Sequence, residues 1–118
     1  MKITAATYNI QFGRGLDGVY DLDRTAREVA GADIVAFQEV AQHWQRNGYE
    51  DQALGLADRL GFHHVFGAGF DVAADVAAKG RRRTFGNMVA SRWPILSSRT
   101  FLLPKVALAR FYDLQRCV

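Results

Sequence analysis

Four consecutive apolar residues, 34–37, lead directly into a polar pair in the first third of the chain. The run leaves no position for a solvated face and is short for a helix, so it predicts a fully buried strand. Gln38 and Glu39 follow at its end. A carboxylate beside a core is costly unless a cation or hydrogen bonds compensate it, so Glu39 requires a partner. The ordinary partner is an arginine or a backbone cap.

A strand and a helix are predicted upstream of this run. Residues 3–10 combine β-branched and aromatic side chains with alanine, which predicts a strand that ends in polar residues, among them Asn9. Apolar positions at helical spacing follow, and they predict a helix. Its expected landmarks are a cap at Asp21 or Asp23, an inward face of Leu22, Ala26 and Val29, a last residue at Ala30 and a stop at Gly31.

A strand, a helix and a second strand in this order form a βαβ unit. The crossover in such a unit is almost always right-handed, so the two strands are expected to be parallel. Their carboxyl ends then meet at one edge of the sheet, which places Asn9 and Glu39 together. Ligands usually bind at this edge in open α/β sheets.

The remaining two thirds of the chain has a less regular pattern. The expected elements are a helix over 49–60 that stops at Gly61, a strand over 62–66, a loop over 67–83, a strand over 84–91, its hairpin partner over 95–103 and a strand-like run over 112–118. A loop as long as 67–83 is usually functional or mobile in a compact domain.

A glycine-rich motif after the first strand suggests a rival function. Gly13, Gly15 and Gly18 match the spacing of the dinucleotide-binding fingerprint, and Glu39 lies about 20 residues further on. In that fingerprint the third glycine already lies in the helix whose amino end faces the pyrophosphate. Here the expected helix cap comes several residues after Gly18. A dinucleotide-binding domain therefore stays an alternative.

Composition narrows the class of protein. The 118 residues form one domain with an ordinary hydrophobic content of 49%, and the net charge of +3 is compatible with phosphate-bearing substrates. One cysteine, Cys117, excludes an internal disulfide framework, which is typical of a reducing compartment. The chain has no long apolar leader and no stretch of about 20 apolar residues, so a cytoplasmic protein without a transmembrane segment is expected.

Three segments, taken in order, resemble the endonuclease/exonuclease/phosphatase superfamily. They are Thr7-Tyr8-Asn9-Ile10-x-x-Gly13, residues 34–40, and residues 85–95 with the sequence Phe-Gly-Asn-Met-Val-Ala-Ser-Arg-Trp-Pro-Ile. The resemblance implies an α/β fold, namely the N-terminal half of a four-layer α/β-sandwich with a mixed β-sheet and helices on one face. Residues 1–118 would then form a single partial domain of this kind.

The resemblance also implies a metal-dependent phosphoesterase. Asn9 and Glu39 match the residues that bind the catalytic divalent metal, Mg²⁺ or Mn²⁺, and are the catalytic and metal-binding candidates. Asn87 matches a residue close to the site and is a substrate-binding candidate. Arg83, in the basic run 79–83, is a second one, although a plain solvated charge run explains that stretch equally well. Independently, Mg²⁺ prefers hard oxygen ligands, which a carboxylate and an amide supply.

The general base is the missing component. Family members are about twice as long, and the resemblance places their base histidine and its aspartate partner in the second half. Hydrolysis by water needs a base within hydrogen-bond reach. His43 is expected in a loop. His63 and His64 alternate across a strand, so at most one of them could face the site. None of the three histidines is therefore a strong candidate for the base.

Several alternatives therefore remain open. The chain is an Mg²⁺-dependent hydrolase of phosphodiesters or phosphomonoesters, or a non-catalytic piece that binds metal or an anionic ligand. Substrates could be nucleic acid, phospholipid or sugar phosphate, because the fold alone does not decide between them. The second face of the sheet would be uncovered, which predicts either self-association through that face as a homo-oligomer or a shortened form of a longer protein.

Overall fold

The computed structural model describes residues 1–103. Within them, β1 (Ala5–Asn9) and β2 (Ile34–Gln42) pair in parallel, and α1 (Leu22–Glu28) lies in the connection between them. A short 3-10 turn, η1 (Gln11–Gly13), follows β1. The βαβ unit predicted from the sequence is confirmed.

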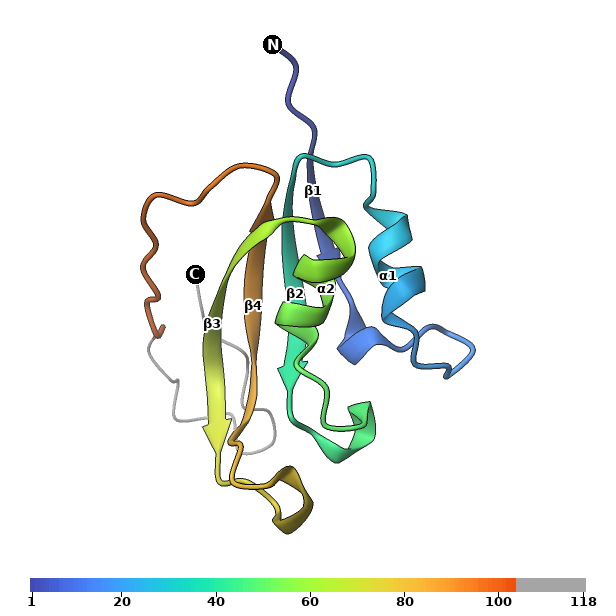
Figure 1. Cartoon of the computed structure of the whole chain (residues 1–118), viewed down its shortest axis with the longest axis vertical. Helices are drawn as coiled ribbons and strands as arrows, with labels where there is room; N and C mark the ends of the chain where they lie inside the picture. The colour runs from blue at the N-terminus through green and yellow to red at the C-terminus, as the bar shows by residue number, and fades with distance from the viewer. Residues whose placement is uncertain (104–118) are drawn as a thin grey trace.

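The second half of the described chain adds α2 (Gln52–Leu60), β3 (His63–Val72) and β4 (Arg83–Ser91), with short turns η2 (Gln45–Asn47) and η3 (Val76–Ala78) between elements. β4 pairs antiparallel with both β2 and β3, so the strand order is β1-β2-β4-β3. The sheet is mixed, and both helices lie over one of its faces (Figure 1). This is the α/β arrangement expected from the sequence.

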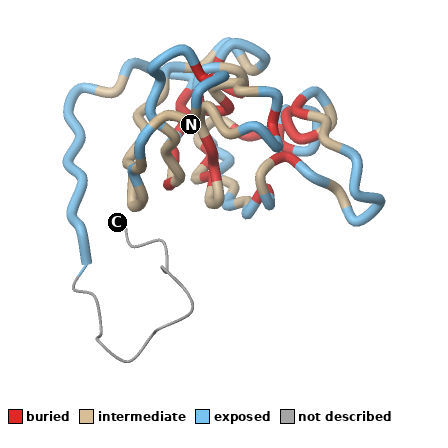
Figure 2. The backbone as a smooth tube through the Cα atoms, turned by 90° about the horizontal axis from the view of Figure 1, so that it is seen from below, coloured by how far each residue is buried: buried red, intermediate tan, exposed pale blue. Residues whose placement is uncertain are grey.

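The hydrophobic core lies between the helices and this face of the sheet. Its fully buried members include Val35, Phe37, Val40, Leu56 and Met88. Figure 2 shows that the buried positions gather in the layer of helices and strands, whereas the segment that leaves β4 is exposed almost throughout. Among the described residues, no element covers the opposite face of the sheet in the way that the helices cover the first.

Local signals set the helix ends. Asp21 caps α1 by accepting a hydrogen bond from the backbone N–H of Arg24, and Asp51 caps α2 in the same way through Leu54. α2 therefore begins at Gln52 rather than near 49, and it ends at Gly61 as predicted. α1 ends at Glu28, with Val29 as its cap, so the predicted end at Ala30 and Gly31 is wrong by two residues.

Two sequence predictions in the second half are wrong. β3 continues to Val72 instead of ending at 66, because β4 supplies pairing partners that outweigh the glycine- and alanine-rich composition of 67–72. The connection to β4 is therefore only 73–82. The expected hairpin strand over 95–103 does not form; apart from one bridge residue, Leu102, that segment is irregular. The strand-like run 112–118 lies outside the described residues.

No helix in the described range 1–103 has the length and hydropathy that crossing a bilayer requires.

Candidate active site

A β-bulge in β2 places Glu39. Phe37 pairs with Met88 and Val40 pairs with Gly86, so Gln38 and Glu39 together lie opposite one residue of β4, which is Asn87. The bulge returns Val40 to the core side and leaves two partly exposed residues in succession. Glu39 has a φ of +59°, in the left-handed region that costs a non-glycine residue about 1 kcal/mol or more.

Asn9 lies beside the bulge on the neighbouring strand. It pairs with Gln38 in the parallel register of β1 and β2, so the expected meeting of Asn9 and Glu39 at one edge is confirmed. The Asn9 side chain is exposed, and its Oδ1 accepts a hydrogen bond from the backbone N–H of Gln11 at 3.0 Å. An amide oxygen has two lone pairs, so one remains for another ligand.

Asn87 completes a row of polar side chains on three adjacent strands, β1, β2 and β4. The glycine before it explains how the row is held in register. A Cβ on Gly86 would overlap the carbonyl group of Gly67 on β3, so the close approach of these strands admits glycine only. The Gly86-Asn87 pair therefore combines a packing requirement with the placement of an amide opposite Glu39.

The surroundings of Glu39 are unusual for a half-buried carboxylate. Within the described residues it accepts no hydrogen bond and forms no ion pair; its electrostatic neighbour is Arg46. The Arg46 guanidinium carbon lies 3.7 Å from the centre of the Phe12 ring and 4.9 Å from that of Trp44. Partial burial lowers the pKa of Arg46, the charge of Arg14 lowers it further, and Glu39 acts in the opposite direction.

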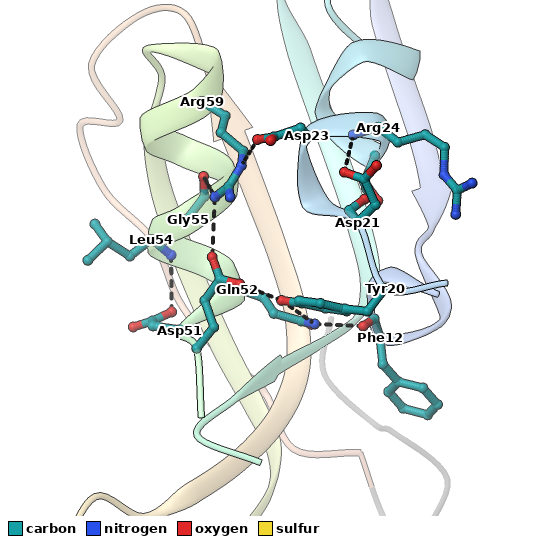
Figure 3. A network of polar contacts seen from close by, with 12 residues as sticks. Phe12, Tyr20, Asp21, Asp23, Arg24, Asp51, Gln52, Leu54, Gly55 and Arg59 are labelled. Atoms are coloured by element: carbon teal, nitrogen blue, oxygen red, sulfur yellow. Dashed lines mark hydrogen bonds and ion pairs between the residues drawn. The ribbon is translucent and has the colours of Figure 1, made fainter. Parts of the chain in front are cut away.

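Gln52 connects the elements that carry this edge. It is fully buried in the first turn of α2; its Oε1 accepts from the backbone N–H of Ala41 at 2.8 Å, and its Nε2 donates to the carbonyl of Phe12 at 2.7 Å. Figure 3 shows Gln52 reaching from α2 towards Phe12 and Tyr20. One side chain thus ties α2 to β2, two residues after Glu39, and to η1.

Tyr20 and Glu50 extend this network. The Tyr20 hydroxyl donates to Glu50 Oε2 at 2.6 Å, and Arg59 donates to the other oxygen of Glu50 at 3.2 Å. Burial raises the pKa of Tyr20 well above its ordinary value, and the Glu50 carboxylate adds to the effect. The hydroxyl is therefore neutral in the folded protein at ordinary pH.

Non-glycine residues with positive φ cluster around the site. Besides Glu39, four non-glycine residues with positive φ lie in the segments that follow β1 and β2, namely Gln11, Phe12, His43 and Tyr49. In the described part of the chain the one other case is Lys79, in the turn after η3. Such residues cluster at functional sites because the surrounding structure must hold them there.

The basic run is partly engaged within the protein. Arg82 pairs with Asp71 at 2.7 Å, and Arg83 donates from Nε to the carbonyl of Ala73 at 2.9 Å. The Arg83 guanidinium carbon also lies 5.0 Å from the centre of the Trp44 ring. Of the two expected substrate-binding residues, Asn87 lies opposite Glu39, and Arg83 lies at the periphery of the same edge.

The histidines occupy two different ends of the sheet. His63 pairs with Ser91, which pairs with Ile34, so His63 and His64 lie at the amino end of the parallel strands, away from Glu39. His43 lies in the loop after β2, as expected, and its Nδ1 donates to the carbonyl of Arg82 at 3.0 Å.

The glycine-rich loop does not support the dinucleotide-binding alternative. Residues 14 and 20 form a β-bridge, and Gly15 exchanges backbone hydrogen bonds with Val19 and Gly18, which closes the loop on itself. The amino end of α1 is occupied by the side chain of Asp21, three residues after Gly18. A pyrophosphate would need the helix end that this carboxylate caps.

The donor set at this edge fits one kind of metal site. Residues 1–103 contain no group of three or more His, Cys, Asp or Glu side chains that could hold a metal ion, which argues against a zinc-type site there. A carboxylate without a hydrogen-bonding partner beside an amide oxygen fits Mg²⁺ or Mn²⁺, which use one or two carboxylates together with waters and substrate phosphate. Glu39 and Asn9 are therefore compatible with such an ion.

Two residues that shape the site escaped sequence reasoning. Arg46 stands in a polar stretch after β2, where a cation gives no signal until the aromatic residues around it are known. For Gln52 the sequence contains a weak signal. It is a polar residue directly before the apolar stripe of α2, and it follows the capping Asp51.

Comparison with known proteins agrees with this architecture. Residues 6–114 match the model of the Endonuclease/Exonuclease/phosphatase family. The fold is similar to the crystal structure of endonuclease/exonuclease/phosphatase from Beutenbergia cavernae, with a TM-score of 0.64 and 27% identity over 86% of this chain. It is also similar in fold to an endonuclease/exonuclease/phosphatase family protein from Leptotrichia buccalis, with a TM-score of 0.58 and 18% identity over 85% of this chain.

The matched region is a small part of those proteins. This chain covers 29% of the Beutenbergia chain and 40% of the Leptotrichia chain. The family match, in contrast, extends over most of the present sequence and includes the segments of Asn9, Glu39 and Asn87. The chain therefore belongs to the endonuclease/exonuclease/phosphatase family.

Proposed function

We propose that the edge carrying Asn9, Glu39 and Asn87 is part of the active site of a metal-dependent phosphoesterase. One observation carries the proposal: Glu39 is a half-buried carboxylate in a strained bulge, with no hydrogen bond or ion pair in the described residues. Such a group is costly unless a ligand completes it. A divalent cation, Mg²⁺ or Mn²⁺, is the ligand that fits.

Each residue then has a role. Glu39 supplies the negative charge and Asn9 the neutral oxygen of the metal site. The bound ion would polarise the phosphoryl group and offset charge that develops on its oxygens. Asn87, opposite Glu39, orients the phosphate ester, and Arg46 and Arg83 provide positive charge beside it. The substrate is a phosphodiester or phosphomonoester.

The general base has no candidate of suitable geometry in residues 1–103. His63 and His64 lie at the far end of the sheet, and His43 donates to a backbone carbonyl. We propose that the base belongs to the part of the family fold that this chain does not span. The lack of a suitable base in residues 1–103 also favours a second candidate function, in which the chain binds metal and phosphate without hydrolysis.

The test is hydrolysis of a chromogenic phosphodiester by the chain with Mg²⁺ or Mn²⁺, with EDTA as the control for metal. Thermal unfolding with and without the ion is measured in parallel. Metal at 100 times its Kd would stabilise the fold by about 2.7 kcal/mol. Glu39→Gln should abolish both effects, whereas Glu28→Gln, which removes an exposed charge at the end of α1, should retain them.

The outcomes separate the two functions. Activity that needs both the ion and Glu39 supports the phosphoesterase. Metal-dependent stabilisation that needs Glu39, without turnover, supports the binding function. Equal stabilisation of wild type and Glu39→Gln by the ion would overturn the metal site itself.

A further inference from the structure

Four aromatic rings and one arginine surround a pocket beside the proposed metal site. The pocket has a volume of about 220 Å³ and is lined by Phe12, Trp44, Arg46, Phe70 and Phe85. These residues come from η1, the segment after β2, η2, β3 and β4, so four elements and one connecting segment build it. Phe12 follows Asn9 by three residues, and Arg46 is the electrostatic neighbour of Glu39.

The rings of this pocket do not belong to the core under the helices. Gly86 and Met88 are buried on the helix side of β4, so alternation places Phe85 on the opposite face, together with Asn87. All four rings are half-buried and keep exposed surface. Phe12 and Phe85 contact at 5.0 Å between centres, and Trp44 and Phe70 stack at 6.2 Å, which holds the two walls in place.

Arg46 has donors to offer at the mouth of this pocket. Its guanidinium carbon lies 3.7 Å from the centre of the Phe12 ring and 4.9 Å from that of Trp44, yet within residues 1–103 its side chain forms no hydrogen bond or ion pair. A guanidinium that contacts aromatic rings still has N–H donors, whose planar arrangement suits bidentate hydrogen bonds to a phosphate. The guanidinium carbon of Arg83, 5.0 Å from the centre of the Trp44 ring, adds positive charge close to Trp44.

Charge and shape together select one ligand chemistry. A quaternary ammonium head group would suit aromatic walls, but a pocket that contains Arg46 repels a cation. A sugar phosphate would suit the arginine but does not use four aromatic rings. A pocket smaller than the roughly 300–1,000 Å³ of whole-ligand sites fits one flat ring system. A nucleobase attached to a phosphate satisfies both features.

We infer that this pocket is a nucleotide subsite, in which an unpaired base of a single-stranded nucleic acid stacks on the aromatic wall and Arg46 donates to its phosphate. The inference rests on the proposed function and deepens it, because it makes single-stranded nucleic acid the substrate class. Stacking of this kind is tolerant of sequence, so the subsite selects an unpaired base rather than a particular one.

Fluorescence of Trp44 provides the test. With Trp93→Phe as background, Trp44 is the only tryptophan, and an oligothymidylate is compared with an abasic oligomer of equal phosphate number, in EDTA to prevent turnover. The base-containing oligomer should quench Trp44 and bind roughly tenfold more tightly. Phe12→Leu and Arg46→Gln should each weaken its binding about tenfold. Phe101→Leu and Arg27→Gln, exposed residues outside the pocket, should not.

Phe85→Leu serves as a second ring variant in case Phe12→Leu lowers the melting temperature. Equal affinity for the two oligomers would overturn the inference, as would pocket variants that bind like the controls. Stronger quenching by anionic phospholipid vesicles than by the oligomer would overturn it in favour of a lipid substrate. Because these titrations contain no metal, their outcome is separate from the Glu39→Gln test: base-dependent quenching without a metal effect leaves the subsite standing and rejects the metal site.

Discussion

Gln52 and Glu39 are two polar side chains close to the same end of β2, and the fold treats them in opposite ways. Gln52 is fully buried, and both of its polar atoms bond to backbone groups of other elements. Glu39 is half-buried and adopts a positive φ, and its carboxylate accepts no hydrogen bond from the described residues. A satisfied polar group strengthens a fold, whereas an unsatisfied one in a strained position motivates the hypothesis that a ligand binds there.

The same contrast extends to the neighbourhoods of the two residues. Around Gln52, α2 is capped at both ends by Asp51 and Gly61, and its inner face packs on the core. Around Glu39, the connecting segments contain strained residues and an arginine stacked on rings. The stabilising contacts of Gln52 and the proposed site at Glu39 thus lie close to the same end of β2, and substitutions should separate their effects.

The largest effect on stability is expected for Gln52→Ala. It leaves the buried N–H of Ala41 and the carbonyl of Phe12 without partners and opens a cavity, at a cost of about 3 kcal/mol in unfolding free energy. Chemical denaturation measures the loss. Gln45→Ala, at an exposed position in η2, is the matched control and should change little. Equal losses in the two variants would show that Gln52 does not connect the elements.

Glu39→Gly should act in the opposite direction. Glycine adopts a φ of +59° without steric cost, so the free energy of unfolding should rise by about 0.5–1 kcal/mol, while any stabilisation by Mg²⁺ is lost. Lys79→Gly relieves a similar strain, at φ +52°, and should keep the response to the ion. A less stable Glu39→Gly protein would mean that the carboxylate stabilises the fold, which would contradict the contrast between Glu39 and Gln52.

Tyr20→Phe tests the network around Gln52 and should cost about 1 kcal/mol near neutral pH, through the lost hydrogen bond to Glu50. The pKa of Tyr20 is raised above its ordinary value of 10.0 in the fold. The stability linked to its proton is therefore complete below pH 10.0 and declines as the pH rises above it. Wild type should lose stability there more steeply than Tyr20→Phe.

Denaturation of both proteins on either side of pH 10.0 checks this expectation. Tyr8→Phe, whose hydroxyl has no hydrogen bond in the described residues, is the control and should follow the wild-type profile. If Tyr20→Phe also follows that profile, the contact with Glu50 does not govern the alkaline loss.

The smallest effect is expected for Asp17→Asn in the glycine-rich loop. Arg24 and the backbone N–H of Val19 hold the pKa of Asp17 at about 2, below its ordinary 3.8. The stability that the lowered pKa contributes is present above pH 3.8 and is lost as the pH falls toward 2. The pair is exposed, so the effect is small. Melting temperatures over this range should fall less steeply in Asp17→Asn than in Asp58→Asn, an exposed control; parallel profiles would contradict the ion pair.

The first third of the chain could be predicted because its signals are local. The apolar run of β2, the cap at Asp21 and the spacing of α1 each act within a few residues, and the handedness of the crossover then makes β1 and β2 parallel. The shared edge of Asn9 and Glu39 followed from these facts alone. The extension of β3 to Val72 could not be predicted, because its stabilising partner, β4, lies more than ten residues away.

By itself, the sequence determined the strand and helix order of the βαβ unit, a cap of the first helix at Asp21 or Asp23, and the presence of a glutamate at the end of a buried strand. Only the tertiary structure decided what surrounds that glutamate. The bulge opposite Asn87, the arginine stacked on Phe12 and the two backbone groups held by Gln52 join segments up to 49 residues apart. Contacts over such separations depend on how the whole sheet packs, and local sequence patterns do not predict that packing.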